Sequence, residues 1–218
     1  MYRVILFDLD GTLTDSGEGI TKSVQYAIEK LGMGEYPLEQ LRSFVGPPLM
    51  EQFMSFCDIS QERAREAVQY YRERYSLVGL YENRPYDGIQ KLLKELKEQG
   101  YLLGVASSKP EYFVDKILKY FSLDSYFDAV VGSELSGQRT SKAEVVEEAL
   151  RRLGVSDRRQ EVVLVGDRKY DVIGARAMGI DCVAVSYGYG DMQELMEVHP
   201  VYIAKSAEEL ADFFGLSL

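Results

Sequence analysis

The chain has 218 residues, 46% of them hydrophobic and 28% charged, with only 6 prolines, so it can form one globular domain with an insertion or two small domains. Its 25 Lys and Arg against 35 Asp and Glu give a net charge of −10 without a long basic run, which argues against nucleic-acid and anionic-membrane partners. Two widely spaced cysteines, an N-terminal stretch that turns acidic early, and no apolar run near the length of a membrane span predict a cytoplasmic protein without a signal peptide.

The first predicted strand covers residues 4–7, and a long stretch of helical periodicity follows it. Four apolar residues before Asp8 are typical of a strand buried on both faces. From residue 16 to residue 84 apolar side chains recur at helical spacing, in stripes that begin at Ile20, Leu38, Leu49 and Ala64. We therefore expect a helical domain at 16–84, inserted into a core domain made of residues 1–15 and 85–218.

Beyond the insertion, predicted strands and helices alternate. Apolar runs predict strands at residues 102–106, 127–131, 162–165 and 182–185. Amphipathic stripes predict helices over 89–96, after the capping boxes Ser141-x-x-Glu144 and Ser206-x-x-Glu209, and around residues 171–178. This alternation predicts an α/β fold with a Rossmann-like, doubly wound parallel sheet, whose ligands bind beyond the carboxyl ends of the strands.

Acidic residues follow two of these strands. Asp8 and Asp10 follow the first strand on the same side of the chain, and Asp167 and Asp171 follow the strand at 162–165. Two close carboxylates repel each other, so one must bind a cation or hold a proton at neutral pH. Each pair also has a structural interpretation, because acids before glycine are common in loops and Asp171 could stabilise the start of a helix.

Hydroxyl and ammonium groups stand at two further segment ends. Ser107 and Ser108 end the strand at 102–106 and offer hydroxyl and backbone N–H groups, although a turn before a helix explains them equally well. Lys142 stands in the first turn of a helix, the unfavourable end for a cation. Together with the helix N-terminus it would form an anion site, the alternative being a solvated surface lysine.

These motifs, taken in order, resemble those of the haloacid dehalogenase-type phosphatases over essentially the whole chain. The matching residues are Asp8-x-Asp10-Gly11-Thr12, Ser107, Lys142 and Gly166-Asp167-x-x-x-Asp171. The helical insertion resembles the C1-type cap of this family, and the longer motifs look most like its phosphoglycolate phosphatase-like and 5′-nucleotidase-like branch. The resemblance implies that the first strand lies between the strands that carry Ser107 and Asp167.

Roles follow from the resemblance by position. Asp8 would attack phosphorus to give an aspartyl-phosphate, and Asp10 would act as general acid and then as general base. The resemblance places Mg²⁺ on the Asp8 carboxylate, the Asp10 carbonyl and Asp167. Asp171 would hold a metal-bound water or orient Asp167. The residues implied to bind the phosphate are Ser107, Ser108 and Lys142, with Ser107 and Ser108 standing where the family commonly has Thr and Asn. The implied partner is a small phosphomonoester, such as phosphoglycolate or a 5′-nucleotide, and the chain would be a monomer or a homodimer.

Other functions compete with this interpretation. A sugar-phosphate mutase of the same family would pass the phosphoryl group to a sugar hydroxyl, and a phosphorylatable signalling module would keep it without turnover. An interaction protein with weak catalysis is a third alternative. Substrate choice would depend on the insertion, where residues 44–49 are either a specificity segment or a turn between helices. Arg42, Arg84 and Lys109 are either anion-binding or, more simply, surface charges, and His199 is predicted to be a surface residue.

Overall fold

A computed structural model describes residues 2–218, which form two compact units. The unit that we call the core unit consists of the residues up to Thr14 together with Pro85–Leu218. The other, the helical unit, is Asp15–Arg84. The structure thus divides the chain one residue earlier at the first crossing than the sequence predicts, and at the same point at the second.

The core unit is built on a six-stranded parallel sheet with the expected Rossmann-like arrangement, in the order β5-β4-β1-β6-β7-β8. Its strands are β1 (Val4–Phe7), β4 (Leu102–Pro110), β5 (Ala129–Ser133), β6 (Val162–Gly166), β7 (Asp181–Val185) and β8 (Tyr202–Ala204). β1 lies between β4 and β6, as the resemblance implied. The carboxyl ends of these three strands therefore meet at one edge of the sheet.

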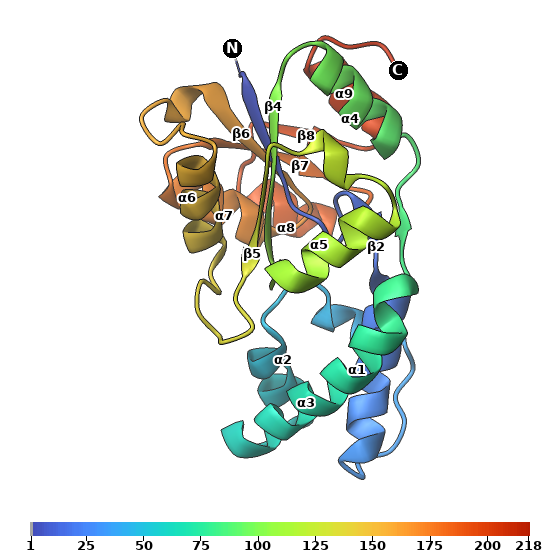
Figure 1. The fold of residues 1–218 in the computed structure, drawn as a ribbon. Helices are drawn as coiled ribbons and strands as arrows, with labels where there is room; N and C mark the ends of the chain where they lie inside the picture. Colours follow the sequence, from blue (N-terminus) through green and yellow to red (C-terminus); the bar gives the residue numbers. More distant parts are fainter. Residues whose placement is uncertain (1) are drawn as a thin grey trace. The chain divides into compact units, whose positions relative to one another are not determined.

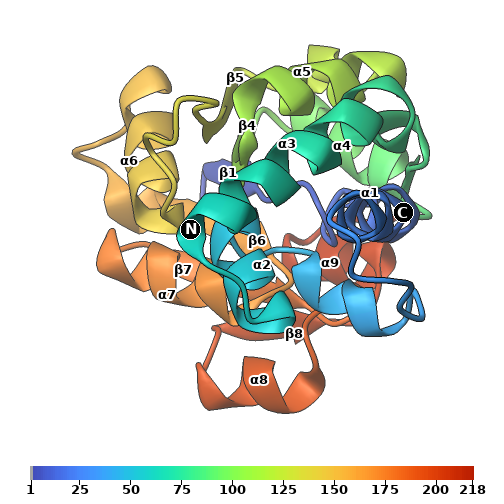
Figure 2. The ribbon, with the colours of Figure 1, turned by 90° about the horizontal axis from the view of Figure 1, so that it is seen from below.

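Helices cover both faces of this sheet. They are α4 (Ile89–Glu98), α5 (Glu111–Tyr120), α6 (Lys142–Arg152), α7 (Lys169–Ala177), α8 (Met192–Glu197) and α9 (Ala207–Phe213), with 3₁₀ turns η3 (Asp124–Tyr126) and η4 (Arg159–Glu161). Figures 1 and 2 show α6 and α7 on one face, and α4, α5 and α9 on the other. Among residues 2–218, the structure contains no helix with the length and apolar character that crossing a membrane requires.

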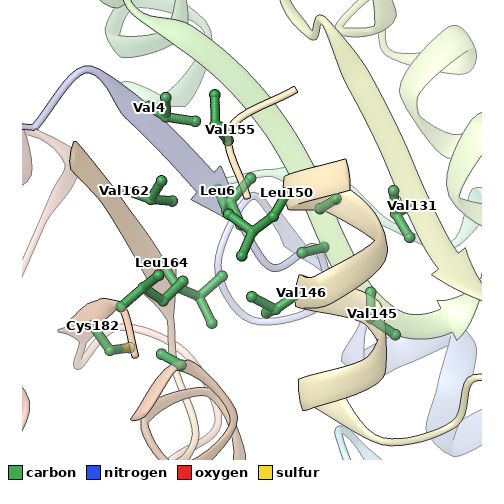
Figure 3. Packing of buried hydrophobic residues seen from close by; sticks show 14 of the residues in the cluster. Val4, Leu6, Val131, Val145, Val146, Leu150, Val155, Val162, Leu164 and Cys182 are labelled. Atoms are coloured by element: carbon green, nitrogen blue, oxygen red, sulfur yellow. The ribbon is translucent and has the colours of Figure 1, made fainter. Parts of the chain in front are cut away.

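The hydrophobic cluster under α6 fixes the start of that helix. Leu6 of β1 and Leu164 of β6 pack against Val146 and Leu150 of α6, and all four are fully buried (Figure 3). Burying each such side chain contributes about 1.5–3 kcal/mol. Ser141 caps the helix, since its hydroxyl accepts a hydrogen bond from the Glu144 N–H at 3.3 Å. The first helical residue, Lys142, is thereby held at the carboxyl edge of the sheet.

The helical unit contains α1 (Gly17–Lys30), η1 (Gln40–Phe44), α2 (Leu49–Cys57), α3 (Gln61–Leu77) and η2 (Gly79–Tyr81). In Figure 2 the first of these helices, α1, is viewed along its axis. Ser60 caps α3 through a hydrogen bond from the Arg63 N–H. The stripe that begins at Leu38 forms only a 3₁₀ turn, because Pro47 and Pro48 follow it and leave too little chain for an α-helix.

Two short strands mark the crossings between the units. β2 (Thr14–Asp15) and β3 (Arg84–Pro85) pair with each other, where the sequence showed no strand pattern. In the core unit, β5 begins two residues later than predicted, helices α5 and α8 were not predicted, and the short edge strand β8 was missed. Strands of two or three residues are too short for apolar periodicity to reveal them.

Candidate active site

The candidate active site begins at the carboxyl edge of the three central strands. Asp8 directly follows β1, Asp167 follows β6, and Ser107 lies within β4, which continues to Pro110. The Asp8 N–H donates a hydrogen bond of 2.9 Å to the carbonyl of Val165, so the parallel pairing of β1 and β6 extends into the site. Side chains that are up to 159 residues apart in sequence therefore meet because their strands are neighbours.

Three buried carboxylates lie close together in the site, and two of them contact one ammonium group. Lys142 Nζ lies 2.9 Å from Asp8 Oδ1 and 2.7 Å from Asp171 Oδ1, and it donates a hydrogen bond of 3.0 Å to the carbonyl of Ala106. One oxygen from each of Asp8, Asp167 and Asp171 lies within 4.8 Å of the others. The structure thus places Lys142 in the site and not on the solvated surface.

Gly174 of α7 makes room for the Lys142 side chain. A Cβ atom at this position would lie 2.6 Å from Lys142 Cγ and 2.7 Å from its Cβ. The close packing of α6 against α7 thus fixes the stem of the lysine, whereas the ion pairs fix its end.

The Asp167 carboxylate is held by a loop that the sequence interpretation did not include. Its Oδ2 accepts a hydrogen bond of 2.7 Å from the Tyr189 N–H, and the Thr12 hydroxyl lies 3.5 Å from its Oδ1. A Cβ atom on Gly188 would lie 2.4 Å from Asp167 Oδ2, and one on Gly190 would lie 2.0 Å from the Asp167 carbonyl. Glycine at both positions lets residues 186–190 lie directly on Asp167.

Gly11, in the turn that follows β1, also lies against Asp167. Its φ is +86°, and a Cβ atom here would lie 2.1 Å from Asp167 Oδ2. The chain turns after Asp10, and the Gly11 N–H donates a hydrogen bond of 2.8 Å to the Thr14 carbonyl. Glycine is required both by the left-handed backbone and by the space that the carboxylate occupies.

Burial and mutual repulsion perturb the ionisation of this cluster. Burial raises the pKa of Asp167 well above its ordinary value of 3.8, and the charges of Asp171 and Asp8 raise it further. Burial also raises the pKa of Asp171, an effect that Lys142 opposes. Burial lowers the pKa of Lys142, but the attraction of Asp171 and Asp8 outweighs it, so the net effect is an increase above 10.5.

These features fit a divalent cation. A cluster of three buried carboxylates with one ammonium group has an excess of negative charge, which a cation would neutralise. The donor set consists of oxygens, which Mg²⁺ prefers. Asp171 is the least suited to direct coordination, because Oδ1 contacts Lys142 and Oδ2 accepts a hydrogen bond from the Arg168 N–H at 3.0 Å.

Asp10 lies beside this cluster and is paired with Lys109. Lys109 Nζ lies 2.7 Å from Asp10 Oδ2, and the exposed fractions of the two side chains are 7% and 12%. The simple interpretation of Lys109 as a surface charge is therefore wrong. The sequence around Lys109 does not reveal this pairing, because the ion pair joins two segments that are far apart in sequence.

The remaining sequence candidates divide between the two units. Ser107 is buried at the end of the regular part of β4, and Ser108 is half-buried beside it. In the helical unit, Arg84 is exposed and pairs with Asp15 at 3.1 Å. Phe44 packs on Phe53 with ring centroids 4.9 Å apart, as expected if residues 44–49 form a turn between helices. Arg42 is largely exposed and His199 is exposed, the latter as predicted.

Comparison with known proteins assigns the chain to a family. A family model described as haloacid dehalogenase-like hydrolase matches residues 5–185. The chain belongs to the haloacid dehalogenase-like hydrolases. The resemblance stated from the motifs is thereby confirmed, and the match includes both the core unit and the helical unit.

Three relatives indicate the range of this family. A Pseudomonas aeruginosa protein named 5′-nucleotidase is 46% identical over 201 residues, which cover 92% of this chain and 90% of that protein. A Mycobacterium tuberculosis protein named tyrosine-protein kinase PtkA is 38% identical, covering 98% of this chain and 73% of its own length. The crystal structure of a predicted phosphatase from Clostridium acetobutylicum has a TM-score of 0.93 and 44% identity, covering 99% of this chain and 100% of that one. Family membership, the relative named 5′-nucleotidase and the structure of a predicted phosphatase support phosphatase activity.

Proposed function

We propose that this haloacid dehalogenase-like hydrolase is a Mg²⁺-dependent phosphomonoesterase that acts in the cytoplasm on a small substrate. The observation that carries the proposal is the ion pair of Lys142 with Asp8, within a cluster of buried carboxylates at the carboxyl edge of β1. An aspartate in this position has a fixed orientation, a cation beside it and a second carboxylic acid, Asp10, two residues away. These are the groups that phosphoryl transfer through a carboxylate requires.

Asp8 is the proposed nucleophile. One of its carboxylate oxygens forms a bond to phosphorus while the bond from phosphorus to the ester oxygen breaks, and Asp10 gives that oxygen a proton. In the second step, water forms a bond to phosphorus and gives a proton to Asp10, the bond to Asp8 breaks, and inorganic phosphate is released. Asp10 thus ends the cycle with the proton with which it began.

The cation would be held by the Asp8 carboxylate, the Asp10 carbonyl and Asp167, with Asp171 orienting a ligand or a bound water. When bound, Mg²⁺ would supply positive charge to the phosphoryl oxygens and to the Asp8 carboxylate. Asp171 has a further role on the protein side, because its contact with Lys142 directs the ammonium group toward Asp8.

Ser107, Ser108 and Lys142 are the proposed phosphate-binding residues. Lys142 is fixed at the first turn of α6, where helix N–H groups and an ammonium group together favour an anion. The Ser107 hydroxyl is held at the same edge of the sheet by the pairing of β4 with β1. Phosphoryl transfer needs stabilisation of charge more than covalent assistance, and these donors would provide it.

A 5′-nucleotide is the foremost substrate candidate, because the relative named 5′-nucleotidase is 46% identical over most of both chains. Phosphoglycolate is the second candidate, from the sequence motifs. The helical unit would serve as the cap that selects between them. One relative is named a tyrosine-protein kinase, so one alternative should be tested directly. In this alternative the chain keeps the phosphoryl group or passes it to another molecule instead of releasing it to water.

Phosphate release by the purified chain tests the proposal. We would compare AMP, phosphoglycolate, a hexose phosphate and p-nitrophenyl phosphate, each with Mg²⁺ and with EDTA. We expect Mg²⁺-dependent release that Asp8→Asn abolishes, whereas the matched variant Asp157→Asn, at an exposed position between α6 and β6, retains it. Full activity in Asp8→Asn would refute the mechanism. More phosphorylated product than free phosphate would favour a mutase, and a stable phospho-Asp8 after acetyl phosphate would favour a signalling module.

A further inference from the structure

The two oxygens of the Asp10 carboxyl group are in different environments. Lys109 donates a hydrogen bond of 2.7 Å to Oδ2. Oδ1 is buried and accepts no hydrogen bond from the described residues. A buried carboxyl oxygen without a partner is costly unless it holds a proton or meets a ligand. The asymmetry therefore leaves Oδ1 as the oxygen that can meet a ligand.

The backbone of Lys109 is fixed, so its side chain extends from a defined origin. Its N–H group donates a weak hydrogen bond of 3.4 Å to the Ser107 hydroxyl, and Pro110 restricts its backbone to an extended conformation. A Cβ atom at Gly132 of β5 would lie 2.5 Å from the Lys109 carbonyl, so this approach of the two strands requires glycine. The pairing of β4 with β5 shifts register between Ala106 and Pro110, where the chain carries Lys109 toward the site.

We propose that Lys109 is a positioning residue for Asp10: it holds Oδ2 and so presents Oδ1 to the leaving group and to water. This inference rests on the proposed function. Rotation about the Cβ–Cγ bond of aspartate is soft, so an unanchored carboxyl group would sample unproductive orientations. Proton transfer needs heavy atoms within about 2.6–3.2 Å, and a misplacement of about 1 Å can reduce the rate about 100-fold.

Comparing kcat for two leaving groups distinguishes a positioning role of Lys109 from a merely structural one. AMP has a poor alkoxide leaving group that needs protonation, whereas p-nitrophenolate leaves with little help. We expect Lys109→Met to lower kcat for AMP about 10-fold to 100-fold and kcat for p-nitrophenyl phosphate less than about 3-fold. KM should stay within about 2-fold for both substrates, because Lys109 would not bind the phosphate.

Two companion variants make the comparison specific. Lys109→Arg retains a cation that can reach Oδ2 and should recover most of the AMP activity. Lys97→Met is the matched control, because Lys97 forms an ion pair of similar length, 2.8 Å to Asp128, elsewhere in the core unit. Its kinetic constants should equal those of the wild type. If thermal unfolding shows that Lys109→Met does not fold, Lys109→Gln replaces it, since it removes the charge but retains a donor.

The Asp10→Asn background tests whether Lys109 acts through Asp10. We expect Lys109→Met to change the residual rate little in that background, because coupled residues show non-additive effects. Three results would overturn the inference and indicate that Lys109 binds substrate directly. They are a loss of kcat in the Asp10→Asn background as large as in the wild type, equal losses of kcat for both substrates, and a rise in KM alone. A wild-type enzyme without turnover on any phosphomonoester would overturn the proposed function and this inference together. An active wild type with unaffected Lys109 variants would overturn only the inference.

Discussion

Replacing Lys142 by methionine removes the only ammonium group that contacts both Asp8 and Asp171 among the described residues, while keeping most of the side-chain length. The lysine is 8% exposed and its partners are buried, so the change leaves uncompensated charge in the interior. Breaking a buried ion pair in this way costs about 3–5 kcal/mol. For a domain of about 150 residues, that loss lowers the Tm by roughly 6–20 °C. Proton uptake by the remaining carboxylates keeps the cost within this range.

Urea unfolding in EDTA at pH 7 measures this loss. Circular dichroism is the suitable probe, because the chain contains no tryptophan. Lys94→Met is the matched control, since Lys94 forms a largely exposed pair with Glu98 at 3.7 Å and should hardly change the transition. Adding Asp171→Leu to Lys142→Met should recover part of the loss, because an apolar side chain replaces an unpaired charge. A loss below about 1 kcal/mol for Lys142→Met would refute the view that this cluster depends on the lysine.

Two further changes test the carboxylate site. Asp167→Asn should stabilise the metal-free protein more at pH 8 than at pH 5. The pKa of the Asp167 carboxyl group is higher in the native protein than in the unfolded chain, so the native state keeps this proton to higher pH. The stability of the wild type therefore falls as the pH rises from 3.8 through the raised native pKa, and the asparagine variant avoids this loss. Thermal unfolding at both pH values measures this, and a gain independent of pH would contradict it. Gly11→Ala should lose more stability than Gly100→Ala, because both have positive φ but only the Gly11 Cβ atom would meet Asp167. Mg²⁺ should also stabilise Gly11→Ala less than wild type, and equal losses in the two glycine variants would contradict the reasoning.

The sequence predicted the central strands well because their signal is local. Residues 4–7 and 162–165 are apolar without interruption, since both faces of β1 and β6 are covered. The capping box at Ser141 likewise located the first residue of α6. The helix predicted from the apolar stripe that begins at Leu38 was wrong for a local reason as well, because Pro47 and Pro48 follow this stripe. Local patterns therefore sufficed for the buried central strands and for the helices that follow a Ser-x-x-Glu capping box, whereas α5 and α8 were not predicted.

The sequence predicted the acidic residues of the site better than their neighbours. Asp8 and Asp167 stand at strand ends, where the chain itself marks them. The loop around Tyr189 had a weaker signal of the same kind, since Gly188 and Gly190 follow the last predicted strand and so lie at the same sheet edge. Their requirement for glycine became visible only with Asp167 beside them. Contacts of this type depend on packing across strands, which a single sequence does not show.

The position of β1 explains why so much charge gathers at one point. Its neighbours β4 and β6 bring Lys109 and Asp167 to either side of the Asp8–Asp10 segment, and α6 brings Lys142 over it. Each of the two lysines contacts one of the two aspartates that the proposed mechanism uses, so the proposed nucleophile and the proposed acid have separate cations. Each aspartate side chain is therefore oriented by a lysine of its own. With a single shared lysine, a change in the orientation of one carboxylate would also change the orientation of the other.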